Sequence, residues 1–434
     1  MSYSARHIRP TFLRAEIDEK RTRQGIGLET AEAHCVPSQP VFSRSCCLRI
    51  GTLDSLHLLD RLIAFPTVSD RSNLQLISFV REFLTSRGFE VMLVEDDTGA
   101  KANLFATLGP AGTPGIILSG HTDVVPVEGQ AWSSDPFVLT QRGEQLFGRG
   151  TTDMKGFVAC ALRAADLASR GALSAPLHIA LSHDEEIGCI GVRSLLDKLR
   201  LSPPKVRLCI VGEPTSMSIG LGHKGKLAAR AVFHGVGGHS AQAPRLLNAL
   251  HLAAEFVLAL RHRQDVLKAQ AVDDPAYDIP YTTVHAGVAG GGTALNLVPE
   301  RAFVDFEIRA IGSVDPTRIL AAISADAEQI VAAHRARFPH AVVEIATINS
   351  YPGLETAADT DAVSFVRGLL DSPSQTKFAF GTEGGLFSEK LGVPVVICGP
   401  GSMTQAHIAD EFITRDQVAA CDRMMDRLVK TLAA

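Results

Sequence analysis

The feature that most limits how this chain can fold is a set of short, largely apolar segments separated by amphipathic helices. Four of these segments are GIILSG at residues 115–120, LHIALSH at 177–183, LCIVG at 208–212 and VVICG at 395–399. Each is too short for a helix, whereas residues 154–171, between the first two, have apolar side chains at helical spacing. Apolar strands that alternate with helices are typical of a mostly parallel sheet with helices on both faces. We therefore predict an α/β fold.

A second pattern begins after Gly222. GKLAARAVFHG alternates like a half-solvated strand, and the stretches RLLNALHLAAEFVLALRHR and PTRILAAISADAEQIVAAH have helical spacing. Because 434 residues are too many for one ordinary core, we expect one domain to interrupt another. The predicted parts are a disordered N-terminal extension at 1–50, the first part of a catalytic domain at 51–222, an inserted α+β domain at 223–349, and the second part of the catalytic domain at 350–434.

Composition argues against several kinds of partner. The net charge of −5 is unlike the basic face that nucleic-acid binding normally needs. No apolar run approaches the roughly 20 residues that cross a bilayer, so we expect no membrane partner. The eight cysteines form no CxxC pair, and we interpret them as reduced thiols of a cytoplasmic enzyme.

Side chains that bind metals follow the apolar segments. In chain order these side chains are His121, Asp123, Asp153, Glu185, Glu186, Glu213 and His407. The carboxyl ends of parallel strands share one edge of a sheet, where ligands bind in the crevice. We therefore expect residues spread over nearly the whole chain to converge on a single site.

The expected site is rich in carboxylates and needs positive charge. Grouping Asp153, Glu186 and Glu213 without a cation would cost several kcal/mol in repulsion and desolvation. Three carboxylates and two imidazoles suit two divalent metals, with one carboxylate bridging them. Zinc accepts these ligands, and Co²⁺ or Mn²⁺ would also be tolerated.

Two carboxylates remain beyond this ligand set. Asp123, two residues after His121, suits a role in accepting the other ring N–H of that histidine. Glu185 should point away from its neighbour Glu186. It is a candidate general base that takes a proton from water and passes it to a leaving amine.

Five motifs in this order and spacing resemble those of the M20 family of co-catalytic zinc hydrolases. The motifs are SGHTDVVP, GRGTTDMKG, HDEEIGC, VGEPT and GPGSMTQAH. The resemblance covers the chain from about residue 54 to its end. It implies two Zn²⁺ ions, with a bridging water as the nucleophile. It assigns His121 and Glu213 to one zinc, Glu186 and His407 to the other, Asp153 to the bridge, Glu185 to the general base and Asp123 to orienting His121.

For the inserted domain, the resemblance implies a lid that also forms a homodimer. The motif GVGGHSA corresponds to the family's histidine, here His239, which commonly reaches the partner's active site and stabilises an oxyanion. The segment TALNLVPERAFVDFEIR supplies Asn296 and Arg309 for the substrate carboxylate. A guanidinium such as Arg309 suits bidentate carboxylate recognition.

Within the family, the segment from Gly381 to Ile413 most resembles the acetylornithine deacetylase branch. The resemblance implies removal of the acetyl group from N-acetylornithine, a step of arginine biosynthesis. As an acid near the expected pocket, Glu383 would also favour a substrate ammonium such as that of ornithine. Alternative activities are succinyl-diaminopimelate desuccinylation or hydrolysis of another N-acyl amino acid or dipeptide. A non-catalytic alternative is an inactive metal-binding relative.

Each candidate residue also has a purely structural interpretation. His121 is compatible with a satisfied core histidine, and Asp153 with a helix N-cap that also serves as a ligand. The pair Glu185–Glu186 is compatible with a solvated turn. An arginine on a strand, such as Arg309, commonly makes a surface salt bridge.

Overall fold

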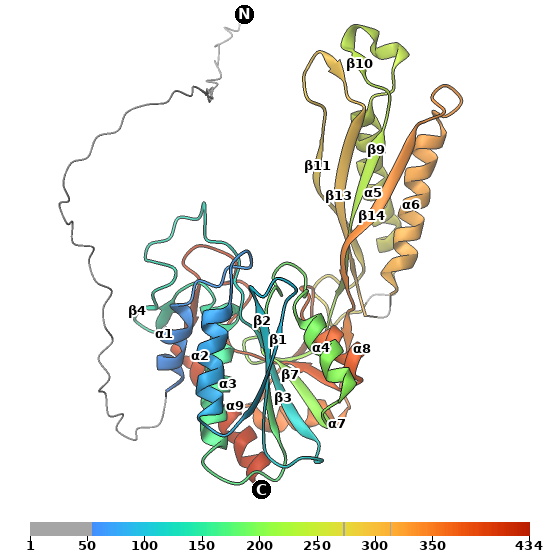
Figure 1. Ribbon diagram of the computed structural model, residues 1–434. Coiled ribbons are helices and arrows are strands. Elements are labelled where there is room, and N and C mark those ends of the chain that lie inside the picture. Colours follow the sequence, from blue (N-terminus) through green and yellow to red (C-terminus); the bar gives the residue numbers. More distant parts are fainter. Residues whose placement is uncertain (1–53, 272–273, 313) are drawn as a thin grey trace, which may run out of the picture. The chain divides into compact units, whose positions relative to one another are not determined.

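The computed structural model describes residues 54–271, 274–312 and 314–434 (Figure 1). The predicted N-terminal extension lies outside the described residues. The central sheet has nine strands in the order β1-β2-β6-β3-β7-β17-β8-β15, with β16 paired to β8. Their bounds are β1 Glu90–Glu95, β2 Ala102–Leu108, β3 Gly115–His121, β6 Leu177–Ser182, β7 Val206–Val211, β8 Ile219–His223, β15 Leu354–Glu355, β16 Gln375–Phe378 and β17 Val395–Ile397.

The middle of this sheet is parallel and its outer parts are mostly antiparallel. β6, β3, β7 and β17 run in the same direction, whereas β1 and β2 are antiparallel to their neighbours. His121 pairs with Ser182, and Ser119 pairs with Val211. The carboxyl ends of β3, β6 and β7 therefore lie at the same edge, which confirms the predicted α/β sheet.

Helices cover both faces of the sheet (Figure 1). The apolar run in β3 shows why both faces must be covered, because Ile116 and Leu118 pack into one core and Ile117 into another. The helices of the first core are α1 Ser55–Ile63, α2 Leu74–Thr85, α3 Gly156–Ala168, α7 Asp361–Leu369 and α9 Arg415–Ala433. Those of the second core are α4 Val192–Leu201 and α8 Gly384–Leu391.

Another set of elements has a hydrophobic core of its own. Four antiparallel strands in the order β11-β13-β9-β14 pack against two long helices, with Phe233, Phe256 and Phe306 in contact at the centre. The bounds are β9 Gly225–His234, α5 Ala249–Gln270, β11 Thr283–Gly291, β13 Arg301–Ala310, α6 Pro316–Ala332 and β14 Val342–Tyr351. We propose that this is the inserted domain expected at residues 223–349.

Several short elements escaped the sequence analysis. They include a small three-stranded sheet in the order β18-β5-β4 and a two-stranded pair, β10-β12. Their bounds are β4 Thr140–Arg142, β5 Gln145–Phe147, β18 Phe412–Thr414, β10 Gly238–His239 and β12 Leu297–Val298. Strands of two or three residues are too short to show an alternation of apolar and polar side chains in the sequence. Among the described residues, no helix has the length and apolar character needed to span a membrane.

Candidate metal centre

Two groups of potential metal ligands lie at the carboxyl edge of the central sheet and share Asp153. The first group is His121, Asp153 and Glu213, and the second is Asp153, Glu186 and His407. Within each group the ligand atoms lie within 4.8 Å of one another. His121 Nε2 is 3.1 Å from Asp153 Oδ1, and His407 Nε2 is 3.1 Å from Asp153 Oδ2. The two oxygens of one carboxylate thus face two different groups.

Asp153 occupies an irregular turn rather than the first residue of a helix. It lies in a π-helical turn, Thr151–Lys155, where its own φ of −122° and ψ of 93° are not helical. The following helix, α3, has Lys155 at its N-cap and no side-chain capping bond. The interpretation of Asp153 as an N-cap was therefore wrong, because two further residues separate it from the helix.

His121 is fixed mainly by the backbone of Asp123. Its Nδ1–H donates to the Asp123 carbonyl at 2.8 Å, whereas the Asp123 carboxylate is 3.6 Å away. That carboxylate accepts hydrogen bonds from the Ser69 hydroxyl and from the amides of Glu185 and Glu186, at 2.8, 3.1 and 3.3 Å. Asp123 therefore orients the histidine through its carbonyl and holds the turn that carries the two glutamates.

The turn after β6 directs Glu185 and Glu186 differently. Glu186 Oε2 is 3.1 Å from His407 Nε2, and its buried Oε1 has no partner within the described residues. Glu185 belongs to neither ligand group. Its carbonyl accepts the amides of Gly188 and Cys189, and its Oε1 accepts the Cys189 thiol at 3.3 Å.

The electrostatics of the site favour a bound cation. Burial, and then the Asp153 carboxylate, raise the pKa of Glu186 to about 7 and that of Glu213 well above its usual range. Burial and the charges of Glu186 and Glu383 raise the pKa of Glu185 in the same way. Hydrogen bonds to Asp153 and Glu186 raise the pKa of His407 to about 10. The raised pKa values show that these groups favour bound positive charge. Divalent ions would provide that charge to this set of nitrogen and oxygen donors.

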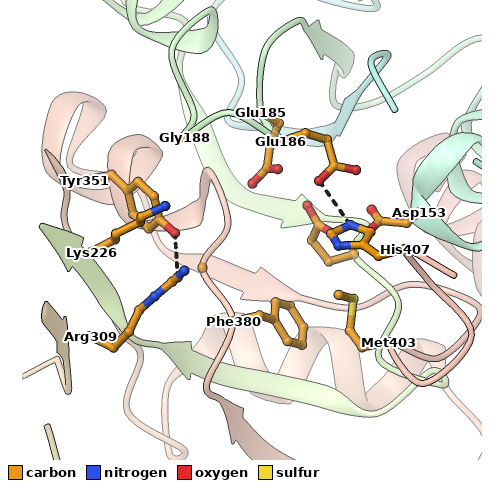
Figure 2. A pocket seen from close by; sticks show the side chains of 12 residues that line it. Asp153, Glu185, Glu186, Gly188, Lys226, Arg309, Tyr351, Phe380, Met403 and His407 are labelled. Carbon is orange, nitrogen blue, oxygen red and sulfur yellow. Dashed lines mark hydrogen bonds and ion pairs between the residues drawn. The ribbon is translucent and has the colours of Figure 1, made fainter. Parts of the chain in front are cut away.

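Four of the five predicted ligands, all but His121, border a cavity of about 140 Å³ whose opposite wall is cationic (Figure 2). On that wall lie Lys226 and Arg309, and Arg309 donates to the Tyr351 hydroxyl at 3.1 Å. Arg309 also pairs with Glu307 at 3.0 Å. The complete lining consists of Asp153, Glu185, Glu186, Gly188, Glu213, Lys226, Arg309, Tyr351, Phe380, Gly381, Met403 and His407. The sequence analysis missed Lys226, which nothing in its surrounding sequence marks.

Five predicted residues do not line this cavity: His121 and Asp123, which lie behind Asp153 and the two glutamates, and His239, Asn296 and Glu383. His239 is exposed, with its Nδ1 accepting the Ala241 amide, and Asn296 is exposed next to it, with its carbonyl accepting the Ser240 amide. Glu383 is only 2% exposed. Burial raises the pKa of its carboxyl to about 7, and the suggestion that Glu383 meets the substrate ammonium stays a prediction.

The sequence analysis also missed Glu411, a buried carboxylate behind Asp153. Its Oε1 accepts the amides of Thr152 and Asp153 at 2.8 and 3.1 Å, and its Oε2 pairs with Arg149 at 2.7 Å. The available signal was its position four residues after His407, immediately before a short apolar segment. Glu411 thereby links the segment that carries Asp153 to the segment that carries His407.

Comparisons with known proteins point to one family. The model of peptidase family M20/M25/M40 matches residues 117–431. An acetylornithine deacetylase from Proteus mirabilis is 34% identical over 382 residues, which is 86% of this chain and 96% of that protein.

Solved structures share the fold. A metallo-carboxypeptidase of the M20 family from Sulfolobus solfataricus matches with a TM-score of 0.70 and 18% identity, covering 88% of this chain and 99% of the other. A dinuclear metal-binding peptidase of the same family from Bacillus subtilis matches with a TM-score of 0.62 and 15% identity, covering 87% and 97%.

Proposed function

The chain belongs to peptidase family M20/M25/M40, whose members hydrolyse amide bonds, and from this premise we propose that it removes the acetyl group from N-acetylornithine. One observation carries the proposal: two ligand groups share Asp153, and the adjacent Glu185 belongs to neither. Relatives that are named acetylornithine deacetylases match most of this chain, and this similarity supports N-acetylornithine as the substrate. We assign the reaction to arginine biosynthesis in the cytoplasm.

We propose that the site holds two divalent ions, Zn²⁺ in the first instance, with Co²⁺ or Mn²⁺ as substitutes. His121 and Glu213 would hold one ion, Glu186 and His407 the other, and Asp153 both. The donor set of two imidazoles and three carboxylates fits zinc. When bound, such ions supply Lewis acidity toward the amide carbonyl and lower the pKa of water.

Glu185 is the proposed proton carrier. It faces the cavity and makes no ion pair with the residues that the structure describes, and burial and neighbouring carboxylates raise its pKa, which favours the uptake of a proton. It accepts a proton from water as the oxygen–carbon bond forms. It then returns that proton to the amine nitrogen as the carbon–nitrogen bond breaks, releasing acetate and ornithine.

The cationic wall is the proposed binding site for the substrate carboxylate. The Arg309 side chain is 27% exposed and points into the cavity opposite the glutamates (Figure 2). Lys226, 3.6 Å from Glu307, adds a second positive charge. With Glu307 balancing one of these charges, the wall keeps a net charge that one carboxylate can neutralise.

We further propose a homodimer in which His239 of the partner subunit reaches this cavity. His239 is exposed, and it belongs neither to the cavity lining nor to a ligand group of the described residues, which supports sharing between subunits. Mixing inactive Glu185→Ala and His239→Ala proteins should restore part of the activity in mixed dimers. No recovery at all would argue that each subunit works alone.

The decisive experiment combines elemental analysis of the purified protein with a panel of N-acyl amino acids. We expect two zinc ions per chain and the highest kcat/KM with N-acetylornithine. Turnover of succinyl-diaminopimelate or a dipeptide alone would replace the substrate assignment. Retained metal without hydrolysis of any panel member would identify an inactive metal-binding relative.

A further inference from the structure

His407 lies on a loop and needs support from elsewhere in the fold. It follows β17 and precedes β18 without belonging to either, and its φ is +63°. Its side chain is 45% exposed, so packing alone does not fix the imidazole. Backbone hydrogen bonds from neighbouring segments must therefore position it.

Arg149 lies at the centre of the contacts that hold this loop. Its side chain is 1% exposed and pairs with Glu411 at 2.7 Å. The same guanidinium donates to the Ile408 carbonyl at 3.3 Å and to Gln130 Oε1 at 2.6 Å. A buried, rigid guanidinium can hold several acceptors in fixed positions at once.

Gln130 extends this contact to His407 itself. Its Oε1 accepts hydrogen bonds from Arg149 and from Trp132 Nε1, the latter at 3.1 Å. Because both partners can only donate, Oε1 must face them. Nε2 then donates to the His407 carbonyl at 3.1 Å.

We propose that Arg149 and Gln130 form a positioning relay that holds His407 toward Asp153 and Glu186. The inference depends on the proposed two-ion centre. Within the part of the chain that the structure describes, Gln130 contacts His407 and neither His121 nor Glu213, so its replacement should weaken the ion position of His407 more than the other. Partners behind a metal ligand typically change metal affinity about ten- to hundredfold when they are replaced.

Trp132 offers a spectroscopic view of the relay. It is the chain's one tryptophan, its indole N–H donates to Gln130, and Arg149 lies 5.1 Å from the centre of its ring. Movement of the His407 loop should therefore alter Trp132 fluorescence. This signal comes from the relay alone, because no other tryptophan contributes.

The test replaces Gln130→Glu in the full-length protein. The change keeps an oxygen for Arg149 and Trp132 but puts a second, negatively charged oxygen against the His407 carbonyl, so the donor to that carbonyl is lost. Gln141→Glu is the matched control, because Gln141 also donates to a backbone carbonyl, that of Gly143 at 3.0 Å, outside the relay. Gln130→Ala is a second variant without the added charge. Metal-free proteins are titrated with Zn²⁺ against a chromophoric chelator while Trp132 fluorescence is followed.

We expect the wild type and Gln141→Glu to bind two ions with the same pair of affinities. In Gln130→Glu one ion should bind about ten- to hundredfold more weakly, with the fluorescence change moving to the same higher Zn²⁺ concentration. The melting temperature of the metal-free protein should be unchanged.

Two results would overturn the relay. Unchanged affinities for both ions in both Gln130 variants would show that the contact does not matter. An equal loss of affinity for both ions, together with a lower melting temperature, would show a general structural defect. A wild type that binds fewer than two ions would instead refute the two-ion proposal, so the two failures are distinguishable.

Discussion

The two ligand groups share Asp153 but are built from different kinds of structure. In the first, His121 ends β3 and Glu213 follows β7, and the His121 side chain is 1% exposed. In the second, Glu186 lies on a turn and His407 on a loop, with the His407 side chain 45% exposed. The sheet itself positions the first group, whereas hydrogen bonds between loops position the second. We therefore expect the first group to bind its ion more tightly.

The largest effect should come from the residue common to both groups. Asp153→Asn removes the shared charge, so both proposed ions should be lost and the rate should fall roughly 10³-fold or more, since metal stabilisation contributes several kcal/mol. Zinc content and kcat measure this result. Asp135→Asn, the same change in an exposed turn, is the control. Retention of both ions would show that neither ligand group needs Asp153 to bind its ion.

The direct comparison uses one histidine from each group. His407→Ala should keep one ion per chain, because the sheet still holds the first group. His121→Ala should keep less than one ion per chain, because the buried Glu213 carboxylate then lacks its histidine partner. Zinc analysis after dialysis at low free metal separates the two. The reverse order of retention would mean that the loop group is the stronger site.

A smaller effect should follow from disturbing the turn that carries Glu185. A Cβ at Gly188, where φ is +115°, would lie 1.6 Å from Asn349 Nδ2. Gly188→Ala should therefore displace the turn and lower kcat roughly ten- to hundredfold, since small misplacements of catalytic groups are costly. Gly99→Ala is matched, with φ of +68° but open space around it, and should leave kcat unchanged. Equal activity in both variants would show that the turn is not held against β14.

The smallest expected effect concerns the sheet rather than the ligands. His178 lies in β6, and burial lowers its pKa from 6.5 to about 4. Between pH 4 and pH 6.5, the unfolded chain therefore binds a proton at His178 that the folded chain does not bind. The contribution of neutral His178 to the free energy of unfolding is thus complete above pH 6.5 and is lost as the pH falls toward 4. At pH 5 the loss is about 2 kcal/mol.

Urea unfolding of metal-free protein at pH 7 and pH 5 checks this value. His178→Gln should lose less stability between the two pH values than the wild type does. The exposed His262→Gln should behave like the wild type. An identical acid dependence in all three proteins would remove His178 as the cause.

The sequence predicts the sheet-borne group well because one physical rule covers it. Ligands at the ends of parallel strands converge whatever their separation along the chain, which is why His121 and Glu213 could be placed from apolar runs alone. His407 lies several residues beyond the end of its apolar segment, so its assignment as a ligand depended mostly on the resemblance. Its loop conformation depends on Arg149 and Glu411, whose contacts span about 260 positions and leave no local pattern.

The same reasoning explains the error at Asp153. Asp153 precedes a helical segment, so the sequence suggested a cap, but the intervening turn is set by contacts with Glu411. Glu383 lies in a motif beside the site, yet it is buried at the start of α8 and does not line the cavity. The sequence pattern places both residues near the centre but does not show how each side chain is packed.

The anchoring of two adjacent glutamates by one aspartate has an evolutionary consequence. Because Asp123 holds the amides of both Glu185 and Glu186, a mutation that shifts one of them also shifts the other. Adaptation to a new substrate is thus confined to residues outside this turn, such as Lys226 and Arg309, which line the cavity from strands β9 and β13 of the other hydrophobic core. Descendants of such an enzyme can change what they recognise while inheriting the same reaction.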